Sequence, residues 1–282
     1  MNYLMIYLKG MLMGFADLVP GVSGGTMALI TGIYQRLINA IAAINIKAFK
    51  LVLIGQINHA WRQIDGWFLL AVFLGMISSI FLFASLIKYL LTNHSILTWS
   101  FFFGLIVSSA VLLIGNNLTK NGLNWLLLVL GVVVGYILST QSIGGMPEGL
   151  LGILIAGMIA ISAMILPGIS GSLILILLGK YQSILGAVEN REWTILLVFA
   201  AGCLIGLMVF SRLLKWLLAH FYQATIYALA GLMLGTLFKV WPWKSATGNV
   251  SPFDHAQPQL IYAMCLMIMA TVFVYIISRV KK

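Results

Sequence analysis

The sequence predicts an all-α polytopic membrane protein made of two inverted repeats, each a broken or re-entrant helical hairpin followed by three transmembrane helices. Of the 282 residues, 62% are hydrophobic and only 8% are charged. About a quarter of the residues of an ordinary soluble domain are charged, so this composition excludes a soluble globular protein. Long uncharged stretches, each sufficient for a crossing of about 20 residues, recur along the chain. A Pro-Gly-X-Ser-Gly sequence occurs once in each half.

The charge balance is basic, with sixteen Lys and Arg against six Asp and Glu. In a chain of apolar spans this excess indicates membrane topology and anionic lipid neighbours, and no nucleic-acid partner is expected. Cys203 and Cys265 both lie inside apolar segments, where they are expected to pack. The four histidines show no spacing typical of a metal site, so we expect neither a metal nor another cofactor.

Internal repetition is the strongest pattern in the sequence. A shift of 147 residues aligns Pro20 with Pro167 and gives eight identities over the 21 positions of residues 20–40. After a shorter linker in the second half, a shift of 127 aligns Gly75 with Gly202. The chain is therefore expected to be a duplication, with repeat 1 at 1–145 and repeat 2 at 146–282.

Each repeat is expected to begin with a hairpin, at 1–46 and at 148–187, because a Pro and Gly cluster interrupts each of these apolar regions. Both full crossing and re-entrance fit this pattern, and the short arm at 24–32 favours re-entrance. Basic and apolar residues mix at 34–65, which predicts an amphipathic segment on the membrane surface. The six remaining apolar stretches are expected to cross the membrane: 67–91, 95–115, 123–140, 193–218, 221–241 and 260–278.

The hairpin and three crossings of one repeat change sides of the membrane overall, so the second repeat should be inverted relative to the first. Placing residues 36–62 in the cytoplasm puts ten of the sixteen Lys and Arg residues on that side. Because positive charge collects in cytoplasmic loops, this orientation is favoured. It places the C-terminus of this multi-pass membrane protein in the cytoplasm.

The two turns are the expected substrate site. Proline ends the incoming half-helix, glycine allows a sharp turn, and Ser23 or Ser170 is suited to cap the outgoing half-helix. The free amides and partial positive charge of a helix N-terminus favour an anion such as phosphate. The alternative is a tolerated kink with a small-residue packing surface. The candidate phosphate-binding residues are Gly21, Ser23, Gly24, Gly25, Thr26, Gly168, Ser170, Gly171 and Ser172.

Asp17 is a candidate proton carrier, because an acid at the end of an apolar half-helix is poorly solvated and faces the negative end of the helix dipole. The aligned residue is Met164, so its role would be asymmetric. Alternatively, Asp17 lies in an aqueous vestibule or pairs with Lys9 or Arg36. Four basic side chains either reach for the membrane interface or attract an anionic headgroup. These are Arg36, Lys88, Arg212 and Lys215.

The motif at residues 14–26, Gly-Phe-Ala-Asp-Leu-Val-Pro-Gly-Val-Ser-Gly-Gly-Thr, continues to Gly32-Ile-Tyr34 and has its partner at 167–172. With these residues the chain resembles the PopT family of bacterial membrane proteins, over nearly its whole length. The resemblance implies a flippase that returns undecaprenyl phosphate from the outer to the inner leaflet of the cytoplasmic membrane for cell-envelope synthesis. Proton or sodium coupling would assist inward movement of the negative lipid.

Three other functions remain open at this point. A secondary transporter of a small soluble anion would use the same turns, and a cavity closed to the bilayer would favour it over a lipid carrier. An assembly factor without a substrate would tolerate loss of Ser23 and Ser170. An enzyme is not expected, because neither serine has an evident His or acid partner and the acids outside the spans form no cluster.

Overall fold

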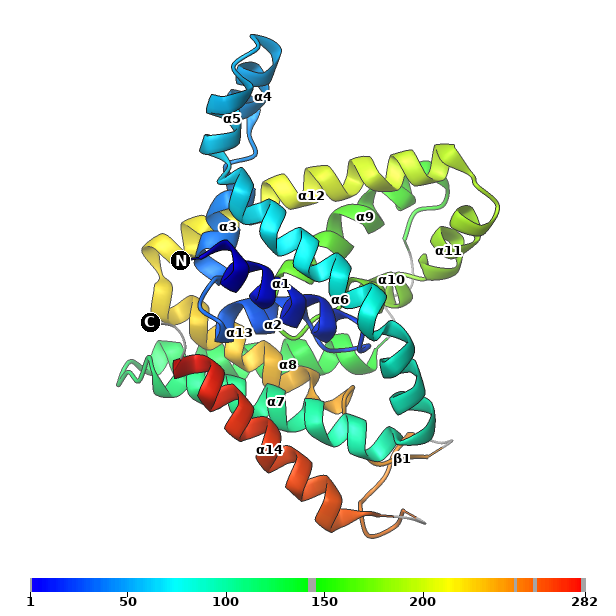
Figure 1. Ribbon diagram of the computed structural model, residues 1–282. Coiled ribbons are helices and arrows are strands. Elements are labelled where there is room, and N and C mark those ends of the chain that lie inside the picture. Colours follow the sequence, from blue (N-terminus) through cyan, green and yellow to red (C-terminus); the bar gives the residue numbers. More distant parts are fainter. Residues whose placement is uncertain (1, 142–145, 246–247, 256–257, 280–282) are drawn as a thin grey trace.

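The computed structural model describes residues 2–141, 146–245, 248–255 and 258–279, and the described chain is almost entirely helical (Figure 1). The expected boundary between the repeats falls at an edge of the described residues, since residue 145 lies outside them and residue 146 lies within them. Lys281 and Lys282, which contribute to the expected cytoplasmic charge, also lie outside the described residues.

Among the described residues, the first half forms eight helices, of which α4 and α5 have no counterpart in the described part of the second half. The helices of the first half are α1 (Tyr3–Asp17), α2 (Gly24–Ile30), α3 (Tyr34–Ala42), α4 (Ile46–Leu53), α5 (Ile57–Gln63), α6 (Gly66–Asn93), α7 (Ser95–Gly115) and α8 (Gly122–Thr140). The elements of the second half are α9 (Gly149–Ile165), α10 (Gly171–Leu177), α11 (Tyr181–Glu189), α12 (Trp193–His220), α13 (Tyr222–Gly235), the 3-10 turn η1 (Thr236–Phe238), β1 (Lys244–Ser245), β2 (Gly248–Asn249) and α14 (Leu260–Arg279).

Five helices in the described ranges, α6, α7, α8, α12 and α14, are long and apolar enough to cross a membrane. The pair α10 and α11, bent by 111°, would make a sixth by length and composition. The span expected at 221–241 differs, because α13 ends at Gly235 and continues only as η1. The second hairpin turn packs there: a Cβ on Gly168 would lie 2.9 Å from the Cα of Met233. The second hairpin turn thus lies against the last turn of α13.

Glycine allows α1 to pack closely on α6, and likewise α9 on α12. A Cβ on Gly75 would clash with the carbonyl oxygen of Tyr7, and a Cβ on Gly202 would clash with that of Leu154. Tyr7 and Leu154 are 147 residues apart, and the two glycines are 127 apart. These are the two shifts that align the halves of the sequence. The same backbone contact therefore occurs once in each half.

The remaining long helices pair between the halves, with α7 against α14 and α8 against α13. Ser108 of α7 and Thr271 of α14 share a hydrogen bond between their hydroxyl groups, 2.7 Å long. Since α13 is the counterpart of α7 and α14 that of α8, each half completes the packing of the other. The core, which includes Phe68, Phe102 and Leu105, lies where these pairs meet the first hairpin.

One contact has no equivalent in the other half. Helix α3 packs against α12, and the Arg212 guanidinium donates to the carbonyl oxygen of Ile44 at 3.4 Å. Within the described residues, α11 does not pack comparably against α6. Helices α4 and α5 project from the body beyond α3, as Figure 1 shows. The two halves thus share their close helix pairs but differ in how α3 and α11 are held.

Candidate functional site

The first turn is built by proline, glycine and serine, each in its expected place. Helix α1 ends at Asp17, and Gly21 adopts a φ of +86°, a left-handed conformation that side chains disfavour. Ser23 is the N-cap of α2, and its Oγ accepts a hydrogen bond from the amide of Gly25 at 3.1 Å. The prediction that Ser23 caps the outgoing half-helix is confirmed.

The second turn has the same backbone but different side-chain contacts. Gly168 has a φ of +85°, and Ser170 occupies the N-cap position of α10 without a side-chain capping bond. Its hydroxyl instead shares a hydrogen bond of 2.8 Å with the hydroxyl of Ser172. The Ser170 and Ser172 hydroxyls are partly exposed, whereas Ser23 is buried. The second turn therefore presents hydroxyl groups that are not needed to hold the backbone.

The two turns contact one another although they are far apart in the sequence. The Ser23 hydroxyl donates to the carbonyl oxygen of Leu166 at 3.1 Å. In the opposite direction, the amide of Gly168 donates to Oγ1 of Thr26, also at 3.1 Å. The Tyr34 hydroxyl adds a third link, to the carbonyl oxygen of Ile165 at 3.2 Å. Residues of both turns thus meet at one place between the halves.

Two charged residues of α1 hold the ends of α2. The Asp17 carboxylate accepts a hydrogen bond from the amide of Gly24, the first residue of α2, at 2.6 Å. The Lys9 ammonium donates to the carbonyl oxygen of Thr31, which caps the other end, at 2.7 Å. A negative group at the N-terminus and a positive group at the C-terminus both match the helix dipole. We call this arrangement the α2 clamp. The aligned residues in α9 are Ala156 and Met164, so the second hairpin lacks it.

The structure does not bring the four predicted basic residues to the turns. Arg36 forms an ion pair of 2.6 Å with Asp65 and lies over the ring of Phe68. Exposed Lys88 lies on α6, while Lys215 and Arg212 lie on exposed positions of α12.

The basic residue beside the first turn is Lys239, which sequence reasoning missed. A Cβ on Gly21 would lie 3.2 Å from Cγ of Lys239, so the stem of this lysine covers the turn. The ammonium of Lys244 donates to the carbonyl oxygen of Lys239 at 2.8 Å. The sequence shows that both lysines precede the last helix. No motif or spacing in the sequence indicates that this segment contacts Gly21.

An apolar groove runs between α1 and α6 on one side and α7 and α14 on the other. It comprises two hollows of about 480 and 410 Å³ that share Phe15 and Phe101. Met27 of α2 lines one hollow, and His94, after the end of α6, lines the other. Met269 in its wall is 52% exposed, so the groove opens on the outside of the helices. The groove therefore connects the first hairpin to the lipid-facing surface.

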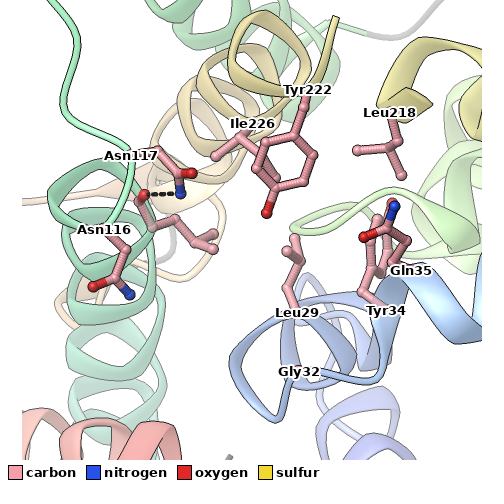
Figure 2. Close-up of a pocket in the computed structure, with 10 residues that line it drawn as sticks. Leu29, Gly32, Tyr34, Gln35, Asn116, Asn117, Leu218, Tyr222 and Ile226 are labelled. Atoms are coloured by element: carbon pink, nitrogen blue, oxygen red, sulfur yellow. Dashed lines mark hydrogen bonds between the residues drawn. The ribbon is translucent and has the colours of Figure 1, made fainter. Parts of the chain in front are cut away.

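A polar cavity of about 390 Å³ lies at the opposite end of α2 (Figure 2). Gln35 from the start of α3 faces Tyr222 of α13, and Asn116 and Asn117 follow the end of α7. The Asn117 amide is held by the carbonyl oxygen of Leu113 at 2.8 Å. Neutral hydrogen-bonding groups thus line the cavity, without a charged side chain among its lining residues.

Within the described ranges, no three His, Cys, Asp or Glu side chains are grouped so that they could hold a metal ion. The Ser23 hydroxyl donates to the backbone carbonyl oxygen of Leu166, and the Ser170 hydroxyl shares a hydrogen bond with that of Ser172. The site therefore offers hydroxyl groups, amides and a carboxylate for binding.

The chain is similar to transporters of known families over most of its length. Residues 13–257 match the sequence model of a family described as undecaprenyl phosphate translocase-like. A relative from Vibrio cholerae, called polyprenyl-phosphate transporter, is 43% identical over 97% of this chain and 96% of its own length. A Staphylococcus aureus protein with the same name is 32% identical over 83% of this chain and 85% of its own length. No solved structure matches the chain.

Proposed function

The chain belongs to the undecaprenyl phosphate translocase-like family, and from this premise we propose that it carries polyprenyl phosphate across the bacterial cytoplasmic membrane. The family consists of transporters and not enzymes. The observation that carries the proposal is the meeting of the two Pro-Gly-X-Ser-Gly turns beside a groove that opens to lipid.

We assign the phosphate headgroup to the two turns. The candidate residues are Gly21, Ser23, Gly24, Gly25 and Thr26 of the first turn and Gly168, Ser170, Gly171 and Ser172 of the second. Several of these groups already bond within the protein, as the Asp17 contact to Gly24 illustrates. The partly exposed hydroxyls of the second turn are the groups that a phosphate reaches without breaking a capping bond. Once the phosphate reaches the turns, these hydroxyls would therefore be the first groups there to contact it.

The groove supports a lipid substrate over a soluble anion. A soluble anion needs a cavity closed to the bilayer, whereas a lipid needs an apolar path beside its headgroup site. Phe15 lines both hollows of the groove and lies two residues before Asp17, and Met27 lies one residue after Thr26. The tail can then stay in apolar surroundings while the headgroup moves through the polar interior.

We propose movement from the outer to the inner leaflet, with the C-terminus in the cytoplasm. Inward movement of a negative headgroup against an inside-negative potential costs about 2.3 kcal/mol per charge at 100 mV. A cation that moves with the lipid offsets this cost. We assign a proton to Asp17, since protonation would weaken its charge-assisted bond to the Gly24 amide and open the end of α2.

Alternating exposure of the site would come from movement of one inverted repeat against the other. Two observations support the repeat: the glycine contacts recur at the shifts that align the sequence halves, and α7 and α8 exchange partners with α13 and α14. The contact of α3 with α12, which α11 does not repeat with α6, supports two halves held in different states. The polar cavity near Gln35 then lies on the cytoplasmic side, where the headgroup would leave.

The function is tested with the purified protein in liposomes. Polyprenyl phosphate is placed in the outer leaflet and its loss from that leaflet is followed, while parallel vesicles receive labelled inorganic phosphate outside. We expect protein-dependent loss of the lipid and no uptake of inorganic phosphate. Uptake of inorganic phosphate without movement of the lipid would replace the lipid by a soluble anion as substrate.

A further inference from the structure

We propose that Lys239 and Lys244 form a capture site for a phosphate monoester headgroup beside the first turn. This inference rests on the proposed function and adds to it the residues that would first hold the substrate. Lys239 directly follows η1, and Lys244 begins β1, on the loop that leads to α14. Neither residue has an aligned basic counterpart in the first half, so the site would occur once in the molecule.

The position of Lys239 connects this site to the hairpin. Its Cγ and Cβ would lie 3.2 and 3.7 Å from a Cβ placed on Gly21, and Cγ1 of Val240 would lie 3.3 Å from the same Cβ. The stem of Lys239 thus rests on the turn while the residue as a whole remains exposed. Lysine commonly packs its carbon stem on apolar surface and keeps its charge in water. The ammonium can therefore reach an anion next to the turn.

Lys244 is fixed in place by two contacts. Its ammonium donates to the carbonyl oxygen of Lys239 at 2.8 Å and lies 3.8 Å from the centre of the Trp99 ring. An ammonium has three donors, so one backbone acceptor leaves capacity for a phosphate oxygen. The cation is thus held in a fixed position beside Lys239.

The two lysines have no counter-ion in the part of the chain that the structure describes. Neither makes an ion pair, although Asp254 lies on the same loop. Burial and the neighbouring charge of Lys239 lower the pKa of Lys244 to about 8. Two cations held close together without a carboxylate repel each other, and a bound anion would relieve that repulsion. A phosphate, with up to two negative charges and three acceptor oxygens, fits this arrangement.

Tryptophans lie around the two lysines. The Trp241 ring packs edge-to-face on the rings of Trp243 and Phe103, with centroid distances of 5.4 and 5.6 Å. The ammonium of Lys244 lies over the ring of Trp99. Trp gathers at the interface between hydrocarbon and water, where lipid phosphates also lie. The loop therefore holds its two charges where a headgroup enters.

The test uses proteoliposomes of neutral phosphatidylcholine, so that no other anionic lipid competes. The half-saturating concentration of polyprenyl phosphate and the maximal rate are measured for a Lys239→Gln, Lys244→Gln double variant. The control that retains both positive charges is the double variant Lys239→Arg, Lys244→Arg. Lys180→Gln, at the bend before α11, is the matched loss of a charge elsewhere.

We expect the half-saturating concentration of the double Gln variant to rise at least tenfold, because the headgroup would lose hydrogen bonds to charged donors. The maximal rate should stay unchanged, and the double Arg variant should behave like the wild type. A half-saturating concentration in the double Gln variant equal to that of Lys180→Gln would overturn the capture site.

Binding of inorganic phosphate separates this inference from the proposed function. Phosphate should raise the melting temperature of the detergent-solubilised wild type but not that of the double Gln variant. If the wild type moves no lipid yet shows this shift, the function fails and the phosphate site stands. A melting temperature that phosphate raises equally in both proteins would refute the site. Competition by phosphate in the transport assay indicates recognition of the phosphate alone, and its absence indicates that the lipid is required.

Discussion

Single charged residues decide how firmly the first hairpin is held. Lys9 is 7% exposed, and with Asp17 it clamps α2 at both ends. Burial of a charge is costly unless the charge is paired and hydrogen-bonded, so these residues are stabilising only together with their backbone partners. The second hairpin, with Ala156 and Met164 at the aligned positions, lacks such charged residues. It is held by packing and by hydrogen bonds to Ser23, Thr26 and Tyr34 of the first half. We infer that the first hairpin is the more rigid of the two.

The clamp predicts a large effect of Lys9→Met. The carbonyl oxygen of Thr31 would lose its charged donor, and we expect the free energy of unfolding to fall by about 1–3 kcal/mol. The same substitution at exposed Lys50 of α4 should change it by about 0.5 kcal/mol or less. Melting temperatures in detergent compare the two variants. Equal melting temperatures for the two proteins would mean that Lys9 does not hold α2.

Asp17→Asn tests the assignment of the proton. Asn keeps an oxygen that can accept the bond from the Gly24 amide but carries no charge, so the variant should fold with the weaker bond of the protonated state. It can no longer exchange a proton, and we expect transport that has lost its response to a pH gradient imposed across the liposome. Asp254→Asn, on an exposed loop position, is the control for loss of an acid. An Asp17→Asn protein with the wild-type pH response would remove Asp17 from the coupling.

Several helix pairs are held by close backbone-to-backbone contact at glycine residues. Lipid tails are as apolar as leucine, so helices in a membrane gain from small residues that let backbones approach. The pairs α1 with α6 and α9 with α12 follow this rule through Gly75 and Gly202. Because the two contacts occupy aligned positions, they should have similar energies.

Gly75→Ala and Gly202→Ala should each destabilise the protein. The added methyl groups would clash with backbone carbonyl oxygens, and overpacking of this kind costs about 1–3 kcal/mol. Gly186→Ala on α11 is the control, because nothing lies within 4 Å of a Cβ there and alanine favours the helix by up to about 1 kcal/mol. Thermal unfolding in detergent should place Gly186→Ala at or above the wild type. A stable Gly75→Ala protein would contradict the close packing.

Local features of the hairpins could be predicted from the sequence, and long-range features could not. The turn at Gly21 and the cap by Ser23 depend on residues next to one another, so spacing predicts them. The bond from Gly24 to Asp17 spans seven residues and was within reach of such reasoning. The contact of Lys239 with Gly21 crosses more than 200 residues and depends on how α13 packs. The early end of α13 was missed because apolar residues continue beyond Gly235.

The whole molecule combines repeated packing with one asymmetric contact. Helix pairs recur in the two halves, while α3 reaches α12 and α11 does not reach α6 to the same extent within the described residues. In a protein whose two halves can exchange conformations, we expect a second state in which α11 packs against α6 and α3 has left α12. Alternating exposure of the turns would then exchange one contact for the other.

Paired spin labels test this exchange. On a background without Cys203 and Cys265, cysteines replace Asn39 of α3 and Lys215 of α12 in one protein. A second protein carries the two cysteines at the aligned positions, Gly186 of α11 and Lys88 of α6. On addition of polyprenyl phosphate in liposomes, we expect a second population in which the first distance lengthens and the second shortens. The exchange would be excluded if both distances changed in the same direction or if neither distance changed.

If polyprenyl phosphate crosses the membrane by way of the paired turns, removal of the hydroxyl groups of the second turn should slow its transport. Ser170→Ala, Ser172→Ala removes two partly exposed hydroxyls that cap no helix by a side-chain bond, so the protein should fold normally. Ser183→Ala, at an exposed position of α11, is the matched control. In the liposome assay we predict lipid transport by wild type and Ser183→Ala, and at least a tenfold loss in the double variant. A folded double variant that moves the lipid at the wild-type rate would contradict the account.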